Sequence, residues 1–236
     1  MLRPLFLLIC PLLFVSTIPA AELTAQALVQ RSLAARGGAD KFAAVHSLRI
    51  HGTLQGSGIL VIARRPSFFR VEVNTPNGLV VEAFDGTKGW SRPPGIAAAE
   101  LSGAQLADLQ DQAANAIGGV LVDAAQRGNK IELEGREQRE GRNCYVLRVK
   151  MPGGRVIHEY LDPVTFLSVH EKLEDGGGKP PIEETIGDYK RFGGILFPCR
   201  FVSGTAADAE KQTLLVEKME INPLLDEKIF VIPTAR

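Results

Sequence analysis

The four histidines are the residues best suited to bind a metal ion, but their spacing does not favour it. His46 and His51 are five residues apart, which places them on opposite faces of a single strand. His158 and His170 are each followed directly by a glutamate. A metalloprotease helix instead needs two histidines one turn apart, with the glutamate between them. The sequence therefore predicts no metal site.

The serine hydroxyls also lack the neighbours that covalent catalysis needs. Ser57 lies between Gly56 and Gly58, but the surrounding residues do not form a G-x-S-x-G motif, and a hairpin turn is the simpler interpretation. The chain has no phosphate-binding loop and no dinucleotide-binding fingerprint. We therefore expect no catalytic residues and no cofactor, and a hydrolase is the least favoured class of function.

The two cysteines beyond the N-terminal segment, Cys144 and Cys199, are not arranged as C-x-x-C. They fall on predicted strands about four positions apart in one sheet, a separation of roughly 19 Å. A disulfide needs Cα atoms closer than about 7 Å. We expect two free thiols, unless the sheet closes on itself.

Residues 1–20 have the composition of a secretory signal peptide. Arg3 precedes an apolar run that ends in small residues at Ala20 and is too short to span a membrane. Cys10 leaves acylation open as an alternative, although its neighbour Ile9 is larger than lipoprotein processing prefers. We expect export to the periplasm.

The rest of the chain, residues 21–236, has the length of one all-β domain. Cleavage of residues 1–20 would remove one charged residue, Arg3. The remaining chain has 26 Lys and Arg against 27 Asp and Glu, a net charge of 26 − 27 = −1. A nearly neutral chain does not favour nucleic acid as a partner. We expect a monomeric domain.

Two short helices are predicted at the start of this domain. Thr24 is a suitable N-cap and Gly37 a suitable stop for a helix over 23–36. A second helical turn is predicted over 39–45, directly after Gly38.

Beyond these helices, the period of the apolar residues changes from helical to two. In 68–73, Phe69 and Val71 share one face while Arg70 and Glu72 share the other, as in a sheet with one dry and one wet face. Similar segments predict a single antiparallel sheet of about eleven strands. They are 48–55, 58–65, 68–73, 78–84, 130–139, 143–150, 154–161, 165–173, 182–190, 195–203 and 211–221.

A longer helix is predicted over 102–127, between the two groups of strands. Its apolar residues recur at helical spacing, and Ser102 with Gln105 forms a capping-box pattern. Gly118 and Gly119 lie inside it, and each costs about 1 kcal/mol relative to Ala in a helix interior. We expect the helix to break or bend there.

A sheet of this size curls because strand twist accumulates, so one face becomes concave. Few elements are available to cover that face, and aromatic residues make up only 6% of the chain, which favours an apolar hollow with the 102–127 helix as a lid. The alternative is an ordinary packed core, in which the glycines allow close contact between helix and sheet.

Several motifs occur in an order that resembles the LolA/LolB-like family, which includes lipoprotein carriers and acceptors. They are ARGGADKFAAVHSLRIHGTL at 35–54, ARRP at 63–66, FDGTKGW at 84–90, VLVDAAQRG before 129, and NPLLDEKIFVIP at 222–233. The resemblance implies an unclosed, half-open β-barrel whose helical lid covers an apolar cavity that takes acyl chains. It covers nearly all of residues 21–236.

The resemblance also implies roles for individual residues. Arg65, in the Arg-Pro motif, would bond backbone carbonyls of the lid, although it could be an ordinary charge at a strand end. Trp90 would line the cavity or anchor the core. The other expected lining residues are Val61, Phe69, Val71, Leu109, Ile117 and Val120.

These features together predict a non-catalytic periplasmic carrier that binds lipid or the acyl chains of lipoproteins. Its expected partners are an inner-membrane donor and an outer-membrane acceptor. The alternative is an envelope sensor or interaction protein that uses the same scaffold to bind a polypeptide.

Overall fold

The computed structural model describes residues 23–175 and 178–234, so the predicted signal peptide at 1–20 lies outside the described residues. Over these two ranges the chain forms one antiparallel sheet of 13 strands and a separate two-stranded hairpin. None of the helices in these ranges is long and apolar enough to cross a membrane.

The sheet strands before residue 101 are β1 (Ser47–Leu54), β2 (Ser57–Arg64), β3 (Phe68–Thr75), β4 (Gly78–Asp85), β5 (Gly89–Arg92) and β6 (Ala99–Glu100). Those after residue 129 are β7 (Lys130–Arg139), β8 (Arg142–Lys150), β9 (Val156–Leu161), β10 (Ser168–Glu174), β11 (Ile182–Gly187), β14 (Arg200–Gly204) and β15 (Gln212–Ile221). The separate hairpin consists of β12 (Lys190–Phe192) and β13 (Ile195–Phe197).

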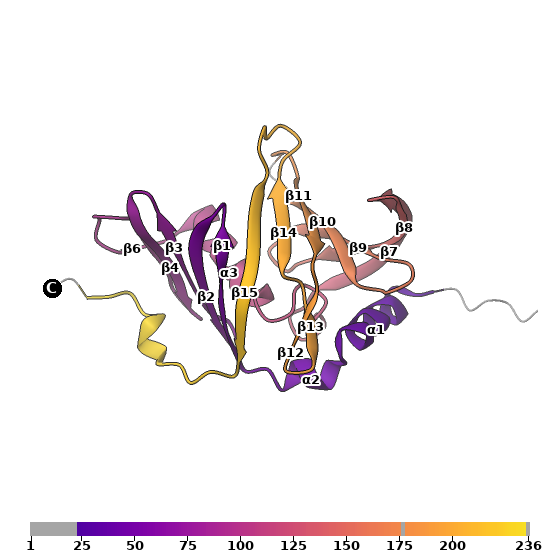
Figure 1. The fold of residues 1–236 in the computed structure, drawn as a ribbon, viewed down its shortest axis with the longest axis horizontal. Coiled ribbons are helices and arrows are strands. Elements are labelled where there is room, and N and C mark those ends of the chain that lie inside the picture. Colours follow the sequence, from indigo (N-terminus) through magenta and orange to yellow (C-terminus); the bar gives the residue numbers. More distant parts are fainter. Residues whose placement is uncertain (1–22, 176–177, 235–236) are drawn as a thin grey trace, which may run out of the picture.

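The strand order is β6-β5-β4-β3-β2-β1-β15-β14-β11-β10-β9-β8-β7, so β6 and β7 are free edges and the sheet does not close. The two groups of strands are joined by β1 and β15, which pair antiparallel near the centre of the molecule (Figure 1). The predicted single unclosed sheet is confirmed. Its 13 strands exceed the predicted eleven because the short strands β5 and β6 also pair.

One predicted strand, at 195–203, is divided in the structure. Pro198 follows β13 and has no N–H group to donate to a ladder, so the chain leaves one strand and begins the next at Arg200. The first part pairs with β12 outside the main sheet, and the second part, β14, pairs with β11 and β15. Two short strands therefore replace the predicted long one.

Within the described part of the chain, three α-helices and one 3₁₀ helix accompany the sheet: α1 (Ala25–Arg36), α2 (Ala39–Ala43), α3 (Gly103–Asn115) and η1 (Glu227–Ile229). The Oγ1 atom of Thr24 accepts a hydrogen bond from the Ala27 N–H at 3.1 Å, which confirms the predicted N-cap. Helix α1 packs against β7 and β13, whereas α3 packs against β3, β4 and β5.

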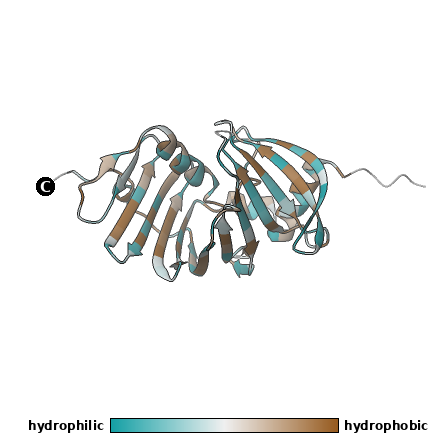
Figure 2. Cartoon of the chain, turned by 90° about the horizontal axis from the view of Figure 1, so that it is seen from above, coloured by the Kyte–Doolittle hydropathy of each residue, from teal (hydrophilic) through white to brown (hydrophobic). Residues whose placement is uncertain are grey.

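The apolar side chains form two main clusters on the side of the sheet that the helices cover. One lies under α3 and includes Phe42, Phe69, Leu109 and Ile117. The other lies under α1. Hydrophobic and hydrophilic residues alternate along the strands (Figure 2), as expected when one face is dry and the other is wet. We call the helix-covered side the inner face.

Candidate functional site

The segment after α3 departs from the sequence prediction of one helix over 102–127. Helix α3 ends at Asn115, and the chain continues as turns to Gly128. Gly118 and Gly119 have φ angles of 94° and 83°, in the left-handed region that favours glycine. The predicted break at these glycines is confirmed, but no helix resumes after it. We call residues 116–128 the closing segment.

The predicted capping box at the start of this helix does not form. Ser102 has the extended backbone of an N-cap, but its side chain makes no capping hydrogen bond. The preceding Leu101 and the following Leu106 pack against the apolar cluster under α3. Burial of these two leucines therefore anchors the beginning of α3.

A cavity of about 770 Å³ lies between the closing segment and the inner face of the sheet. Strands β1, β2, β9, β10, β11, β14 and β15 contribute to its wall, as do α3 and the closing segment. Its volume is within the roughly 300–1,000 Å³ typical of ligand pockets. Most of its lining is apolar and includes Ile50, Ile59, Val61, Val120, Leu121, Ile157, Leu173, Ile182, Ile186, Phe201, Val216 and Met219.

Two of the predicted lining residues, Val61 and Val120, contribute to the wall of this cavity. The other apolar predictions lie elsewhere on the inner face. Phe69, Leu109 and Ile117 are buried in the cluster under α3, and Val71 packs against that cluster. The cavity is thus centred on β15 and the strands on both sides of it. Contacts of a ligand with Phe69, Val71, Leu109 and Ile117 stay predictions.

Trp90 lies on the opposite face of the sheet from the α3 cluster. It packs with Val81 and Ala83, and its Nε1 atom donates a hydrogen bond to the Phe230 carbonyl oxygen at 2.7 Å. It is 2% exposed and does not belong to the cavity wall. These contacts favour the core-anchor alternative, in which Trp90 attaches the C-terminal segment to the sheet.

Arg65 also lies outside the cavity wall, at the end of β2. Its Nε donates to the Val45 carbonyl oxygen at 2.7 Å and its Nη2 to the Phe42 carbonyl oxygen at 3.1 Å. Its Nη1 pairs with the carboxylate of Asp123 in the closing segment. Arg65 thus contacts the closing segment through a carboxylate, whereas the carbonyls that it bonds belong to the α2 region.

The arginine that bonds a carbonyl of the closing segment is Arg36, at the end of α1. Its Nη1 donates to the Gly118 carbonyl oxygen at 2.7 Å, and its Nε donates to the Leu196 carbonyl oxygen at 3.2 Å. The guanidinium lies over the rings of Phe42 and Phe197, and the residue is 6% exposed. Burial lowers the pKa of Arg36 below its ordinary value. Arg36 lines the cavity, and sequence reasoning missed it.

Three glutamates on neighbouring strands form a polar band across the cavity wall. Glu171 on β10 is directly opposite Glu159 on β9 and Glu184 on β11. All three line the cavity, and we call them the glutamate row. Like charges directly opposite one another destabilise a sheet. The arrangement is therefore unfavourable unless protons or a cation compensate it.

The surroundings of the glutamate row raise the pKa of each carboxyl. Burial raises the pKa of Glu159, and burial together with the neighbouring carboxylates raises that of Glu171 well above its ordinary value. Burial and the charge of Glu159 raise the pKa of Glu184 to about 7. Desolvation disfavours the charged form of a carboxyl, and a second carboxylate adds to this effect.

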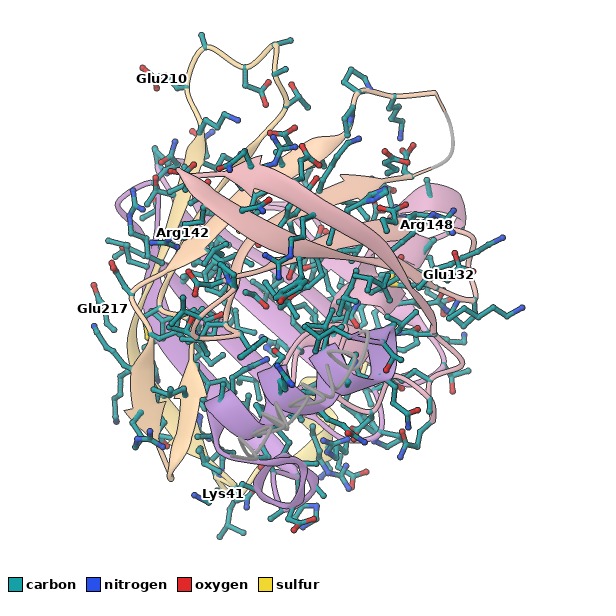
Figure 3. The ribbon with its side chains drawn as sticks, turned by 90° about the vertical axis from the view of Figure 1, so that its right-hand side faces the viewer. Lys41, Glu132, Arg142, Arg148, Glu210 and Glu217 are labelled. Carbon is teal, nitrogen blue, oxygen red and sulfur yellow. The ribbon has the colours of Figure 1, made fainter. Side chains whose placement is uncertain are left out.

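Two hydroxyl groups adjoin the row. The Ser168 Oγ donates to Glu159 Oε1, and the Tyr189 hydroxyl donates to the Ser168 carbonyl oxygen at 2.9 Å. Burial raises the pKa of Tyr189, so this phenol stays neutral at physiological pH. By contrast, Glu132 and Glu217 lie at the edge of the molecule and point outward (Figure 3). The glutamate row instead lines the cavity.

The thiol prediction is confirmed: Cys144 and Cys199 are both buried and free. Cys144 belongs to β8 and Cys199 directly precedes β14, so strands β9, β10 and β11 separate them in the sheet. Across residues 23–175 and 178–234, no three or more His, Cys, Asp or Glu side chains are grouped in a way that would hold a metal ion.

The fold is shared with several solved structures. A LolA superfamily protein from Nitrosomonas europaea superimposes with a TM-score of 0.59 at 16% sequence identity, covering 89% of this chain and 98% of the other. A DUF1329 family protein from Desulfovibrio piger gives a TM-score of 0.63 at 11% identity, covering 88% and 97%. A protein described as an outer membrane lipoprotein-sorting domain, from Vibrio parahaemolyticus, gives 0.56 at 11% identity, covering 86% and 94%.

These similarities show that the chain shares its fold with the LolA superfamily protein and the lipoprotein-sorting domain, which agrees with the fold that the sequence resemblance implies. No protein-family model matches the chain, and no curated protein matches it in sequence. The low identities establish the architecture, and the function has to be argued from the cavity.

Proposed function

We propose that this protein is a non-catalytic carrier of the bacterial envelope that holds lipid or the acyl chains of a lipoprotein in the cavity. The observation that carries this proposal is the cavity of about 770 Å³ with its mostly aliphatic wall. Burial of an acyl chain contributes about 0.8 kcal/mol per CH₂ group removed from water. An apolar hollow of this size therefore favours a hydrocarbon ligand.

The position of the cavity supports a carrier role. One boundary is the closing segment, which is attached to the rest of the fold by the Arg36 bond to Gly118 and the Arg65 pair with Asp123. The segment consists of turns, so its movement breaks few backbone hydrogen bonds, although it has to expose Ile117 and Val122, which are buried in the cluster under α3. A ligand could then enter and leave without unfolding of the sheet. The lipoprotein-sorting description of one structural neighbour agrees with this proposal.

Native mass spectrometry of protein purified without detergent tests the proposal directly, because a carrier should retain a bound amphiphile. Uptake of a fluorescent fatty-acid probe gives an independent measurement. Val61→Trp should fill part of the cavity and weaken probe binding about 10-fold or more, since each ~1.4 kcal/mol corresponds to a factor of ten. Absence of both a co-purified amphiphile and probe uptake would contradict the proposal.

The matched control is Leu60→Trp. Leu60 is the chain neighbour of Val61, points to the opposite face of β2 and does not line the cavity. Probe binding should be unchanged in this variant. A protein partner that binds wild type and Val61→Trp equally well would instead favour the envelope interaction role.

A further inference from the structure

The glutamate row is unexpected in a cavity whose only task is to bind hydrocarbon. Along each strand, the positions two residues away on the same face are apolar: Ile157 beside Glu159, Leu173 beside Glu171, and Ile182 beside Glu184. A carboxyl group is costly in such surroundings unless it is hydrogen-bonded or paired with a charge. The row therefore calls for a partner.

The described residues satisfy the row only in part. Glu159 is 3% exposed, and its Oε1 accepts a hydrogen bond from Ser168, but its Oε2 is buried without a hydrogen-bond partner among the residues that the structure describes. Because Glu159 belongs to the cavity wall, this unpaired acceptor lies beside the space that a ligand would occupy. Glu159 and Glu171 can hydrogen-bond to each other through their side chains only when one of them carries a proton, so with both ionised no donor of the described residues reaches this oxygen.

The charge of Arg36 acts on Glu159 and Glu171, but it supplies only part of the compensation. Burial raises the pKa of Glu159 and of Glu171, and the charge of Arg36 opposes only part of this rise. The Nη1 and Nε atoms of Arg36 already donate to the carbonyl oxygens of Gly118 and Leu196. With all three glutamates ionised, the row and Arg36 together carry a net charge of −3 + 1 = −2. The missing donor can be a proton shared between the carboxyls, or a positively charged group of a ligand.

We propose that the glutamate row is the head-group site of the cavity and binds the protonated amine of a cationic amphiphile, whose hydrocarbon chain lies along the apolar wall. The inference rests on the proposed carrier function. An ammonium group has three donors and no acceptor, so it complements a row of carboxylate acceptors. Hydrogen bonds between charged groups are roughly twice as strong as neutral ones. A carboxylate head group would instead face like charges.

The test compares three probes of equal chain length: dodecylamine, dodecanol and dodecanoate. Each of the three compounds is kept below its own critical micelle concentration. At pH 8 it competes with a fluorescent fatty-acid probe for binding to the whole protein after removal of the predicted signal peptide. We expect dodecylamine to bind about 10-fold or more tightly than dodecanol, and dodecanoate to bind most weakly. Equal affinity for all three, or tightest binding of dodecanoate, would overturn the amine proposal while the carrier function stands.

Variants of the row provide the second arm. Glu171→Gln and Glu184→Gln keep the shape of the side chain and remove a charge, so they should abolish most of the preference for dodecylamine over dodecanol. Glu183→Gln is the matched control, because Glu183 neighbours Glu184 on β11, lies outside the cavity wall and pairs with His170. An undiminished preference for dodecylamine in both row variants would overturn the proposal. Failure of all three probes to compete in wild type would contradict the carrier function itself.

Discussion

The Nη1 atom of Arg36 donates a hydrogen bond of 2.7 Å to the carbonyl oxygen of Gly118, 82 positions away in the chain. This bond joins the end of α1 to the closing segment, beside the rings of Phe42 and Phe197. One arginine therefore fixes the cavity boundary and contributes positive charge to the adjacent glutamates. Its removal should affect both the stability and the mobility of this region.

Arg36→Met should reduce the free energy of unfolding by about 2–4 kcal/mol, because two buried carbonyl oxygens lose a charged donor. Urea denaturation measures this loss, and hydrogen exchange at 116–121 should become faster. Arg31→Met is the control, since Arg31 is an exposed residue of the same helix. Unchanged exchange in the closing segment of Arg36→Met would show that the bond does not hold it.

Gly118→Ala should be more destabilising than Gly119→Ala. Both positions have positive φ, which costs a residue with a side chain roughly 1–2 kcal/mol. At Gly118 an added Cβ would also lie 2.6 Å from Val122 Cγ2 and 2.9 Å from Phe42 Cε1, whereas at Gly119 no atom lies within 4 Å. Thermal unfolding of the two variants measures the difference. Equal losses would mean that the packing around Gly118 adapts freely.

The pH dependence of stability should carry a contribution from Glu184. Its pKa rises from an ordinary value of 4.5 to about 7 in the folded protein, so the folded state binds the proton more tightly than the unfolded state does. This contribution is fully present below about pH 4.5 and is lost as the pH rises through about 7. It amounts to at most about 3.5 kcal/mol, for a shift of about 2.5 pKa units at ~1.4 kcal/mol per unit.

As the pH rises from 5 to 8, the free energy of unfolding of Glu184→Gln should therefore fall less than that of wild type. Urea denaturation across this pH range measures the difference. Glu159 and Glu171 contribute with the same sign, because their pKa values are also raised. His170 contributes with the opposite sign, because burial lowers its pKa and its stabilisation is lost as the pH falls. A pH profile of Glu184→Gln identical to that of wild type would contradict the assignment.

The main strands were predictable because each is long enough to show its alternation. In β3, Phe69 and Val71 separate clearly from Arg70 and Glu72, and the observed strand has eight residues. Strand β5 has four residues and β6 has two, too few for a period of two to appear. The pairing of β5 with β4 and of β6 with β5 depends on the turns that connect these strands, which the pattern does not specify.

The polar part of the cavity left only weak signals in the sequence. Leu28, Ser32 and Arg36 recur every four residues on one face of α1, but only the fold shows that this face is buried. The alignment of Glu171 with Glu159 depends on an irregularity between Ser168 and His170 that shifts the register of β10 against β9. Strand register of this kind cannot be read from one sequence.

Trp90→Phe should separate the two roles considered for this residue. The variant keeps an aromatic ring in the cluster with Val81 and Ala83 but loses the Nε1 hydrogen bond to the Phe230 carbonyl oxygen. Loss of this buried bond should lower the free energy of unfolding by about 1–2 kcal/mol, because the carbonyl oxygen loses its donor. Affinity for the fluorescent fatty-acid probe should stay within experimental error of wild type, since Trp90 lies outside the cavity wall. A marked loss of affinity at unchanged stability would show instead that the tryptophan contacts the ligand.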